Sequence, residues 1–280
     1  MEKVKKILVL GSSGMLGHIL VDTIKSKKNF QLSNIARRKT IFNDTVICDV
    51  TDFNELEENI IKLSPDFIIN CVGVLINESE NNPKNAILIN AYLPHFLESI
   101  SEKQSFQLIH ISTDCVFNGS IGNYHEGSKK DAEDIYGISK GLGEIISPNH
   151  LTIRTSIIGP EIKNNPEGLF EWVLKNKSKK IDGYSESIWS GVTTLVLSKG
   201  IIYCIENNIK GLLHIASNKI SKFDLICIIN EVYNLGVTIK KVKGKKSDKS
   251  LISNRKDFLF KIPSHFQMIS EMSDFMNQNQ

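Results

Sequence analysis

The chain has 280 residues, of which 41% are hydrophobic and 23% charged, and Lys and Arg outnumber Asp and Glu by 34 to 31. This composition excludes a fibrous or largely disordered chain, and so small a basic excess gives no reason to expect a nucleic-acid partner. The five cysteines lack C-x-x-C spacing, so neither a disulfide framework nor a zinc site is indicated. The lack of a disulfide framework fits a reducing cytoplasm, where we expect the protein. Because no apolar run approaches the roughly 20 residues that cross a bilayer, we expect no membrane partner.

In the N-terminal half, short apolar runs alternate with longer segments of helical periodicity. Such alternation predicts a parallel sheet with helices on both faces, that is, a Rossmann-type doubly wound α/β fold. We expect strands at 7–10, 31–36, 45–48, 67–71, 107–111 and 151–153, and helices at 15–24, 53–63, 86–100 and 135–146.

After Gly159-Pro160 the sequence becomes richer in loop-forming residues, and we place a domain boundary there. Residues 1–160 form the predicted Rossmann domain, and residues 161–280 a smaller C-terminal α/β domain. As an alternative, a segment near residues 180–207 could return to pack on the first domain. In the second domain we expect helices at 169–175, 194–206 and 222–233 and strands at 212–215 and 237–239.

A G-x-x-G-x-x-G turn, formed by Gly11, Gly14 and Gly17, lies between the first strand and the first helix. Glycines permit a tight turn and a close approach of the backbone to a pyrophosphate, while a helix N-terminus offers unpaired N–H groups to the anion. The alternative is a turn that serves only strand–helix packing. In a dinucleotide site, the residues of this turn that contact the cofactor are Gly11, Ser13, Gly14, Met15 and Leu16.

The end of the second strand indicates which dinucleotide binds. A site for NAD normally has an acidic residue there for the ribose 2′-hydroxyl, whereas this chain has Arg37 and Arg38, which suit a 2′-phosphate. We therefore expect NADPH as the cofactor, with NADH as the open alternative. The ends of the next two strands add the expected cofactor residues Asp49, Val50, Cys71, Val72 and Gly73.

Three residues carry the expected chemistry. Thr113 follows the fifth strand, at the edge of the sheet where ligands of open α/β folds bind, and Tyr136 and Lys140 share one face of a predicted helix. Reduction of a ketone needs a proton for the developing alkoxide. We assign the proton transfer to Tyr136, expect Lys140 to lower the pKa of Tyr136 and to hold the cofactor ribose, and expect Thr113 to hydrogen-bond the substrate oxygen. Tyr136 and Lys140 are therefore both expected to contact the cofactor as well.

The motifs G-S-S-G-M-L-G, S-T-D-C-V-F-N-G, Y-G-I-S-K-G-L-G-E and I-R-T-S resemble those of the extended short-chain dehydrogenase/reductases, most closely the dTDP-4-dehydrorhamnose reductase group. The resemblance covers nearly the whole chain. It implies an NADPH- or NADH-dependent oxidoreductase that reduces a nucleotide-activated 4-keto-6-deoxysugar at C4, in deoxysugar biosynthesis for cell-surface polysaccharides, and a second domain that binds this substrate. The expected substrate residues are Asp114, Cys115, Val116, Trp189 and Arg255.

The sequence departs from the pattern of the group at two positions. Cys115 replaces the usual tyrosine after S-T-D, and His18 lies where some members have a glutamate metal ligand, so we expect no metal. A sugar-nucleotide dehydratase fits less well, because dehydratases commonly have Asp-Glu where this chain has Asp114-Cys115. A sugar-nucleotide epimerase and a non-catalytic NADP-binding regulatory subunit stay open, and a homodimer is the default expectation.

Overall fold

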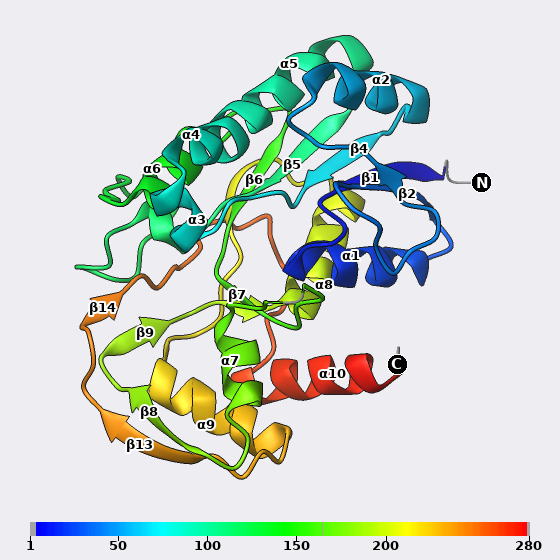
Figure 1. Cartoon of the computed structure of the whole chain (residues 1–280). Coiled ribbons are helices and arrows are strands. Elements are labelled where there is room, and N and C mark those ends of the chain that lie inside the picture. Colours follow the sequence, from blue (N-terminus) through cyan, green and yellow to red (C-terminus); the bar gives the residue numbers. More distant parts are fainter. Residues whose placement is uncertain (1–3, 164, 279–280) are drawn as a thin grey trace.

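The computed structural model of the chain describes residues 4–163 and 165–278. Its centre is a seven-stranded parallel sheet with strand order β11-β6-β5-β4-β1-β2-β3 (Figure 1). The order reverses between β1 and β4, as in the Rossmann fold, so the predicted fold class is confirmed. The strands are β1 (Lys5–Leu10), β2 (Phe30–Ala36), β3 (Val46–Ile47), β4 (Phe67–Asn70), β5 (Gln107–Ile111), β6 (Leu151–Arg154) and β11 (Gly211–His214).

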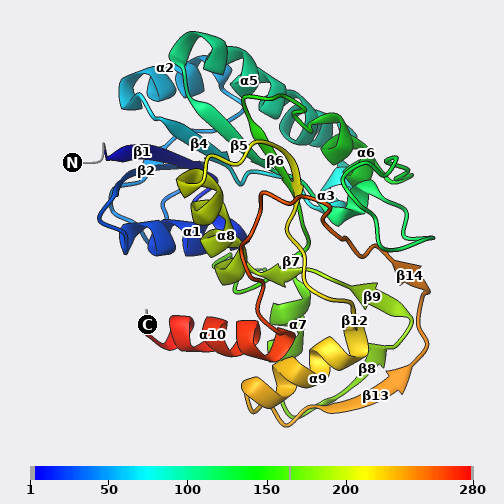
Figure 2. The ribbon, with the colours of Figure 1, turned by 180° about the vertical axis from the view of Figure 1, so that it is seen from behind.

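Helices cover both faces of this sheet, as Figures 1 and 2 show. On β1, Ile7 and Val9 belong to a core that includes residues of α1 (Met15–Lys25) and α8 (Thr194–Glu206). The alternate residues Leu8 and Leu10 belong to a second core with residues of α2 (Phe53–Leu63) and α5 (Leu93–Gln104). Since successive side chains of a strand point to opposite faces, a continuous apolar run is what a strand buried on both sides requires.

The region between β4 and β5 is more divided than the sequence predicts. The helix expected at 86–100 is part of a longer rod made of α4 (Pro83–Ala86), a π-helical segment (Ile87–Tyr92) and α5. It is preceded by a short helix that periodicity did not indicate, α3 (Ile76–Asn81). These additions bring polar side chains to the carboxyl edge of the sheet.

Helix α6 (Ile135–Leu142) carries the predicted catalytic pair and ends before the predicted end at residue 146. The backbone passes against the π-helical segment at Gly143, where an added Cβ would lie 1.9 Å from the Asn90 carbonyl oxygen. Only glycine allows this approach, and the chain then turns away from the helix axis.

The second lobe lies beyond the carboxyl edge of the sheet (Figure 2). It contains the parallel pair β8 (Lys180–Tyr184) and β13 (Thr238–Val242), a three-stranded sheet and the short pair of β7 (Ile157–Ile158) and β10 (Val192–Thr193). The three-stranded sheet consists of β9 (Ser187–Trp189), β12 (Ile220–Ser221) and β14 (Ser247–Asp248), and the helices are α7 (Leu169–Lys175), α9 (Lys222–Val232) and the unpredicted α10 (His265–Gln278).

The segment after residue 190 crosses back to the central sheet. Helix α8 packs against α1, and β11 pairs with β6 at the sheet edge. The expected division at residues 160 and 161 remains a prediction. Within the described ranges, no helix combines the length and apolar character that crossing a membrane requires.

Candidate active site

The glycine turn has a geometry that only these glycines allow. Gly11 has φ of 82°, in the left-handed region, and its N–H donates to the Ile35 carbonyl oxygen at 2.9 Å. An added Cβ on Gly17 would lie 2.1 Å from the Gly11 carbonyl oxygen, so α1 packs against the turn only because position 17 has no side chain. The N-cap residue of α1, Gly14, provides no side-chain hydrogen bond, which leaves the helix N-terminus available to an anion.

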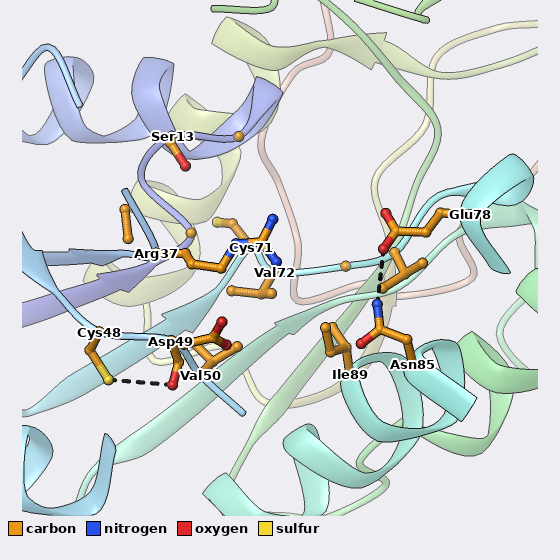
Figure 3. A pocket seen from close by; sticks show the side chains of 15 residues that line it. Ser13, Arg37, Cys48, Asp49, Val50, Cys71, Val72, Glu78, Asn85 and Ile89 are labelled. Carbon is orange, nitrogen blue, oxygen red and sulfur yellow. Dashed lines mark hydrogen bonds between the residues drawn. The ribbon is translucent and has the colours of Figure 1, made fainter. Parts of the chain in front are cut away.

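A cavity of about 220 Å³ opens beside this turn, between the carboxyl ends of the strands (Figure 3). Most of the expected cofactor residues line it, whereas Met15, Leu16, Arg38, Tyr136 and Lys140 do not. The lining residues that were expected are Gly11, Ser13, Gly14, Arg37, Asp49, Val50, Cys71, Val72 and Gly73, and those that were not are Ala36, Cys48, Val74, Glu78, Asn85 and Ile89.

Arg37 and Asp49 lie together at one end of the cavity (Figure 3). Burial works to raise the pKa of Asp49, but hydrogen bonds from the backbone and hydroxyl of Thr51, together with the Arg37 guanidinium, hold it below its usual range. Asp49 is therefore ionised, and this end of the cavity presents both a cation and a fixed anion. Arg37 and Arg38 are both exposed to solvent, but only Arg37 lines the cavity.

The other end of the cavity has polar residues that the sequence did not single out. Asn85 of α4 donates to the carboxylate of Glu78 of α3 at 2.9 Å. Behind them, buried Asn90 accepts a hydrogen bond from the Val74 N–H at 2.8 Å and donates to the Ser139 hydroxyl of α6 at 3.1 Å. Asn90 thus joins the loop after β4 to α6, the helix that carries the predicted catalytic pair. A polar residue within the apolar run I-L-I-N-A-Y was the only sequence signal for it.

The three predicted catalytic residues meet at the carboxyl end of β5. The Thr113 hydroxyl accepts the Cys115 N–H at 3.1 Å, and the Lys140 ammonium donates to the Ile111 carbonyl oxygen at 2.6 Å. Helix α6 lies directly against this segment, because an added Cβ on Gly137 would be 2.2 Å from the Cys115 carbonyl oxygen. The same contact places Tyr136 next to Thr113, whose side chain hydrogen-bonds the phenol.

The sequence predicted a lowered pKa for Tyr136, but in the structure this pKa is raised. Burial raises it, and the negative charge that Cys115 would carry adds to this, while the hydrogen bond from Thr113 works in the opposite direction. Lys140 is buried as well, and burial lowers its pKa to about 8 against the opposing effect of Glu144. In the protein alone, the phenol therefore keeps its proton at neutral pH.

Only some of the expected substrate residues lie next to Thr113, and Trp189 and Arg255 lie elsewhere. Asp114, Cys115 and Val116 directly follow Thr113, and burial raises the pKa of both Asp114 and Cys115. Trp189 is buried, and its indole N–H donates to the Ser156 hydroxyl at 3.1 Å, so its ring is not presented for stacking on a ligand.

Arg255 lies away from the catalytic residues. Its guanidinium donates to Asp257 at 2.7 Å and to the carbonyl oxygens of Lys210 and Leu212 at 2.8 and 2.9 Å. Those carbonyls lie at and just before the amino end of β11, whereas the predicted catalytic residues lie at the carboxyl ends of the parallel strands. The structure thus does not bring Arg255 to the site.

A different cation of the second lobe, Lys249, faces the catalytic segment. The chain before it is anchored there, because the Asp248 N–H donates to the Gly119 carbonyl oxygen at 2.8 Å. The positive charge of Lys249 works to lower the pKa values of Asp114 and Cys115, although burial outweighs it. Lys249 forms no hydrogen bond or salt bridge in the part of the chain that the structure describes. In the sequence it was indistinguishable from the neighbouring lysines.

The fold and this set of residues are those of an extended short-chain dehydrogenase/reductase. Within that class, the sequence pattern of the family described as "RmlD substrate binding domain" matches residues 5–255. The chain belongs to this family.

Two curated relatives show the range of proteins that resemble the chain. The probable low-salt glycan biosynthesis reductase Agl14 of Haloferax volcanii is 29% identical over 54% of this chain, and the match spans 52% of that protein, about half its length. Methionine adenosyltransferase 2 subunit beta of Bos taurus is 24% identical over 82% of this chain and 73% of its own.

Solved structures agree in fold. A hypothetical dTDP-4-dehydrorhamnose reductase from Sulfolobus tokodaii superposes with a TM-score of 0.77 and 29% identity, covering 88% of this chain and 91% of that chain. The dTDP-4-dehydrorhamnose reductase of Bacillus anthracis, solved in complex with NADP, has a TM-score of 0.84 and 19% identity over 97% of this chain and 99% of that chain.

Proposed function

We propose that this chain is an NADPH-dependent reductase that converts the C4 ketone of a nucleotide-activated 4-keto-6-deoxysugar to an alcohol, in deoxysugar biosynthesis. The observation that carries the proposal is the meeting of Thr113, Tyr136 and Lys140 at the end of β5, beside the cavity at the glycine turn. The family and the reductases among its relatives support the same reaction class.

The cavity residues suit a phosphorylated dinucleotide. The Gly11–Gly14 turn and the N-terminus of α1 would hold the pyrophosphate, and Arg37 the 2′-phosphate that distinguishes NADPH from NADH. Lys140 would hold the nicotinamide ribose. When bound, the reduced nicotinamide supplies the hydride.

The residues of the chain supply the proton that the reduced oxygen needs. As negative charge develops on the C4 oxygen, the Tyr136 phenol donates its proton to it, and the Thr113 hydroxyl donates a hydrogen bond to the same oxygen. A phenol whose pKa is raised by burial holds its proton throughout the neutral range, as a donor in the direction of reduction must. Lys140, four residues after Tyr136 on α6, would supply positive charge as the phenolate forms.

The diphosphate of the substrate needs a cation near the sugar site. We assign this role to Lys249, in place of the Arg255 expected from the sequence, because Arg255 is bound to Asp257 whereas Lys249 acts on the catalytic segment at Asp114 and forms no salt bridge within the described residues. Asp114 and Cys115 would line the sugar site between Lys249 and the catalytic residues. Val116, which the sequence also suggested for this site, is instead fully buried in a small apolar core with Phe117 and Tyr124.

Incubation of the purified protein with NADPH and a panel of nucleotide-linked 4-keto-6-deoxysugars tests the proposal. We expect loss of the reduced-nicotinamide absorbance with at least one of them. Isomerisation of a nucleotide sugar without net consumption of NADPH would instead identify an epimerase.

A regulatory subunit is the second candidate, and the similarity to methionine adenosyltransferase 2 subunit beta favours it specifically. Tight NADPH binding without turnover of any sugar in the panel would support this candidate and contradict the reductase. Light scattering of the same preparation would test the expected homodimer.

A further inference from the structure

A buried ion pair lies between the strands and the helix that carry the catalytic residues. The side chain of Glu144 is 0% exposed and that of Arg154 is 3% exposed. Arg154 binds the carboxylate through two hydrogen bonds, from Nε at 2.7 Å and from Nη2 at 2.8 Å. The ammonium of Lys130 lies 3.0 Å from Glu144 Oε2, and the Ser112 hydroxyl donates to Glu144 Oε1 at 2.8 Å.

These contacts join the elements of the active site. Ser112 directly precedes Thr113 at the end of β5, and its N–H also donates to the Ile153 carbonyl oxygen of β6 at 2.7 Å. Glu144 follows the end of α6, the helix that carries Tyr136 and Lys140. The Glu144 carboxylate therefore connects the end of β5, which carries Thr113, to α6, which carries Tyr136 and Lys140.

Glu144 also acts on the charge of Lys140. The titratable groups that face this lysine are Glu144 beyond α6, Cys71 after β4 and His110 on β5. Burial raises the pKa of Cys71 to about 12 and lowers that of His110 well below its usual range, so both are neutral near pH 7. Glu144 is thus the negative charge among them that favours the ammonium form of Lys140.

Stability alone does not explain such a cluster, because a buried ion pair is often no more stabilising than well-packed apolar residues. Resting on the reductase function proposed above, we propose that Glu144 is a positioning residue, whose carboxylate holds Thr113 in register with α6 and keeps Lys140 in its charged form. It acts through Ser112 and Lys140 and does not touch the substrate.

The test measures NADPH binding by nicotinamide fluorescence between about pH 6 and pH 10, a range that brackets the titration of Lys140. If the ammonium of Lys140 holds the cofactor ribose, binding weakens as pH rises through its pKa of about 8. Glu144→Gln removes the negative charge and keeps the shape of the side chain. We expect the midpoint to move down by at least about half a pH unit, because loss of an opposite charge disfavours the ammonium.

A second variant is expected to shift the pH midpoint of NADPH binding in the opposite direction. Lys130→Met removes a cation that partly neutralises Glu144, so the midpoint should move to higher pH. Since the Lys130 side chain is 35% exposed, this variant is expected to fold even if Glu144→Gln does not. The matched control is Glu126→Gln, which removes a carboxylate bound to the His214 N–H and to Ser253 but which does not act on Lys140, and should leave the midpoint unchanged.

The positional half of the proposal is tested by Ser112→Ala. Loss of this single hydrogen bond should lower kcat about tenfold, as expected for about 1.4 kcal/mol of lost transition-state positioning, with KM changed less than about twofold. Midpoints that stay at the wild-type pH in both Glu144→Gln and Lys130→Met, or an unchanged kcat in Ser112→Ala, would overturn the inference. Absence of turnover in the wild-type protein contradicts the proposed function instead, and the binding midpoints still decide the role of Glu144.

Discussion

The glycine turn and the catalytic cluster are built in different ways. In the turn, the deciding contacts join residues close in the chain, such as the Gly14 N–H with the Gly11 carbonyl oxygen and Gly17 with Gly11. The catalytic cluster depends on segments far apart, because Asn90 and Lys249 reach it from other elements. A local motif thus specifies the shape of the turn, whereas the cluster takes its geometry from the folded chain. Changes in the turn should therefore affect mainly cofactor binding. Changes in the cluster should affect turnover, and those that act on Lys140 should affect cofactor binding as well.

The largest effect is expected for Tyr136→Phe. Because phenylalanine has no proton to donate, the rate should fall by roughly 10²- to 10⁴-fold, the usual contribution of general acid catalysis. The NADPH dissociation constant, measured by fluorescence, should change less than about twofold, because phenylalanine keeps the aromatic ring and Lys140 is unchanged. A variant that keeps the wild-type rate would remove Tyr136 from the mechanism.

Gly17→Ala tests the turn. Its Cβ would lie 2.1 Å from the Gly11 carbonyl oxygen, so the strand and helix must separate. We expect the free energy of unfolding to fall by about 1–3 kcal/mol, as for other overpacked sites, and NADPH binding to weaken by more than tenfold.

Gly141→Ala is the control for this change, because its nearest neighbour would be Lys130 Cδ at an ordinary 3.4 Å. Denaturant unfolding and NADPH titration of both variants measure the difference. Equal stability of the two variants would contradict the steric explanation of the turn.

Arg37→Ala tests whether the cavity beside the turn selects NADPH over NADH. Loss of a charged hydrogen bond costs about 1.5–3 kcal/mol, so the affinity for NADPH should fall roughly 10- to 100-fold while that for NADH stays nearly constant. Arg38→Ala should change neither, since Arg38 does not line the cavity. If both cofactors weaken equally, Arg37 does not contact the 2′-phosphate.

Lys249→Ala is expected to have the smallest effect. Removal of a partly exposed cation from a diphosphate should raise KM for the nucleotide sugar by about fivefold to tenfold, or about 1 kcal/mol, and change kcat less. Lys246→Ala, at an exposed lysine nearby, should leave KM unchanged. Steady-state kinetics of both variants measure the difference. If the two variants have the same KM, Lys249 does not bind the diphosphate.

Much of the fold follows from periodicity. The predicted bounds of α2, α7, α8 and β5 match the structure. Helix α2 has an apolar face with helical spacing, whereas α8 and β5 are buried over most of their length. Helix α3 did not show in the pattern, since it is short and mostly exposed. The predicted roles of Arg255 and Trp189 rested on residue type alone, and the structure shows both engaged in contacts within the protein.

The sequence by itself determined the sheet, the glycine turn and the Thr113–Tyr136–Lys140 set, because these depend on local spacing and on the rule that ligands bind at the carboxyl ends of parallel strands. Only the tertiary structure decided that Arg37 and not Arg38 lines the cavity, that Lys249 and not Arg255 faces Asp114, and that burial raises the pKa of Tyr136. Exposure, desolvation and contacts between distant segments are properties of the packed chain, and no spacing of residues along the sequence encodes them directly.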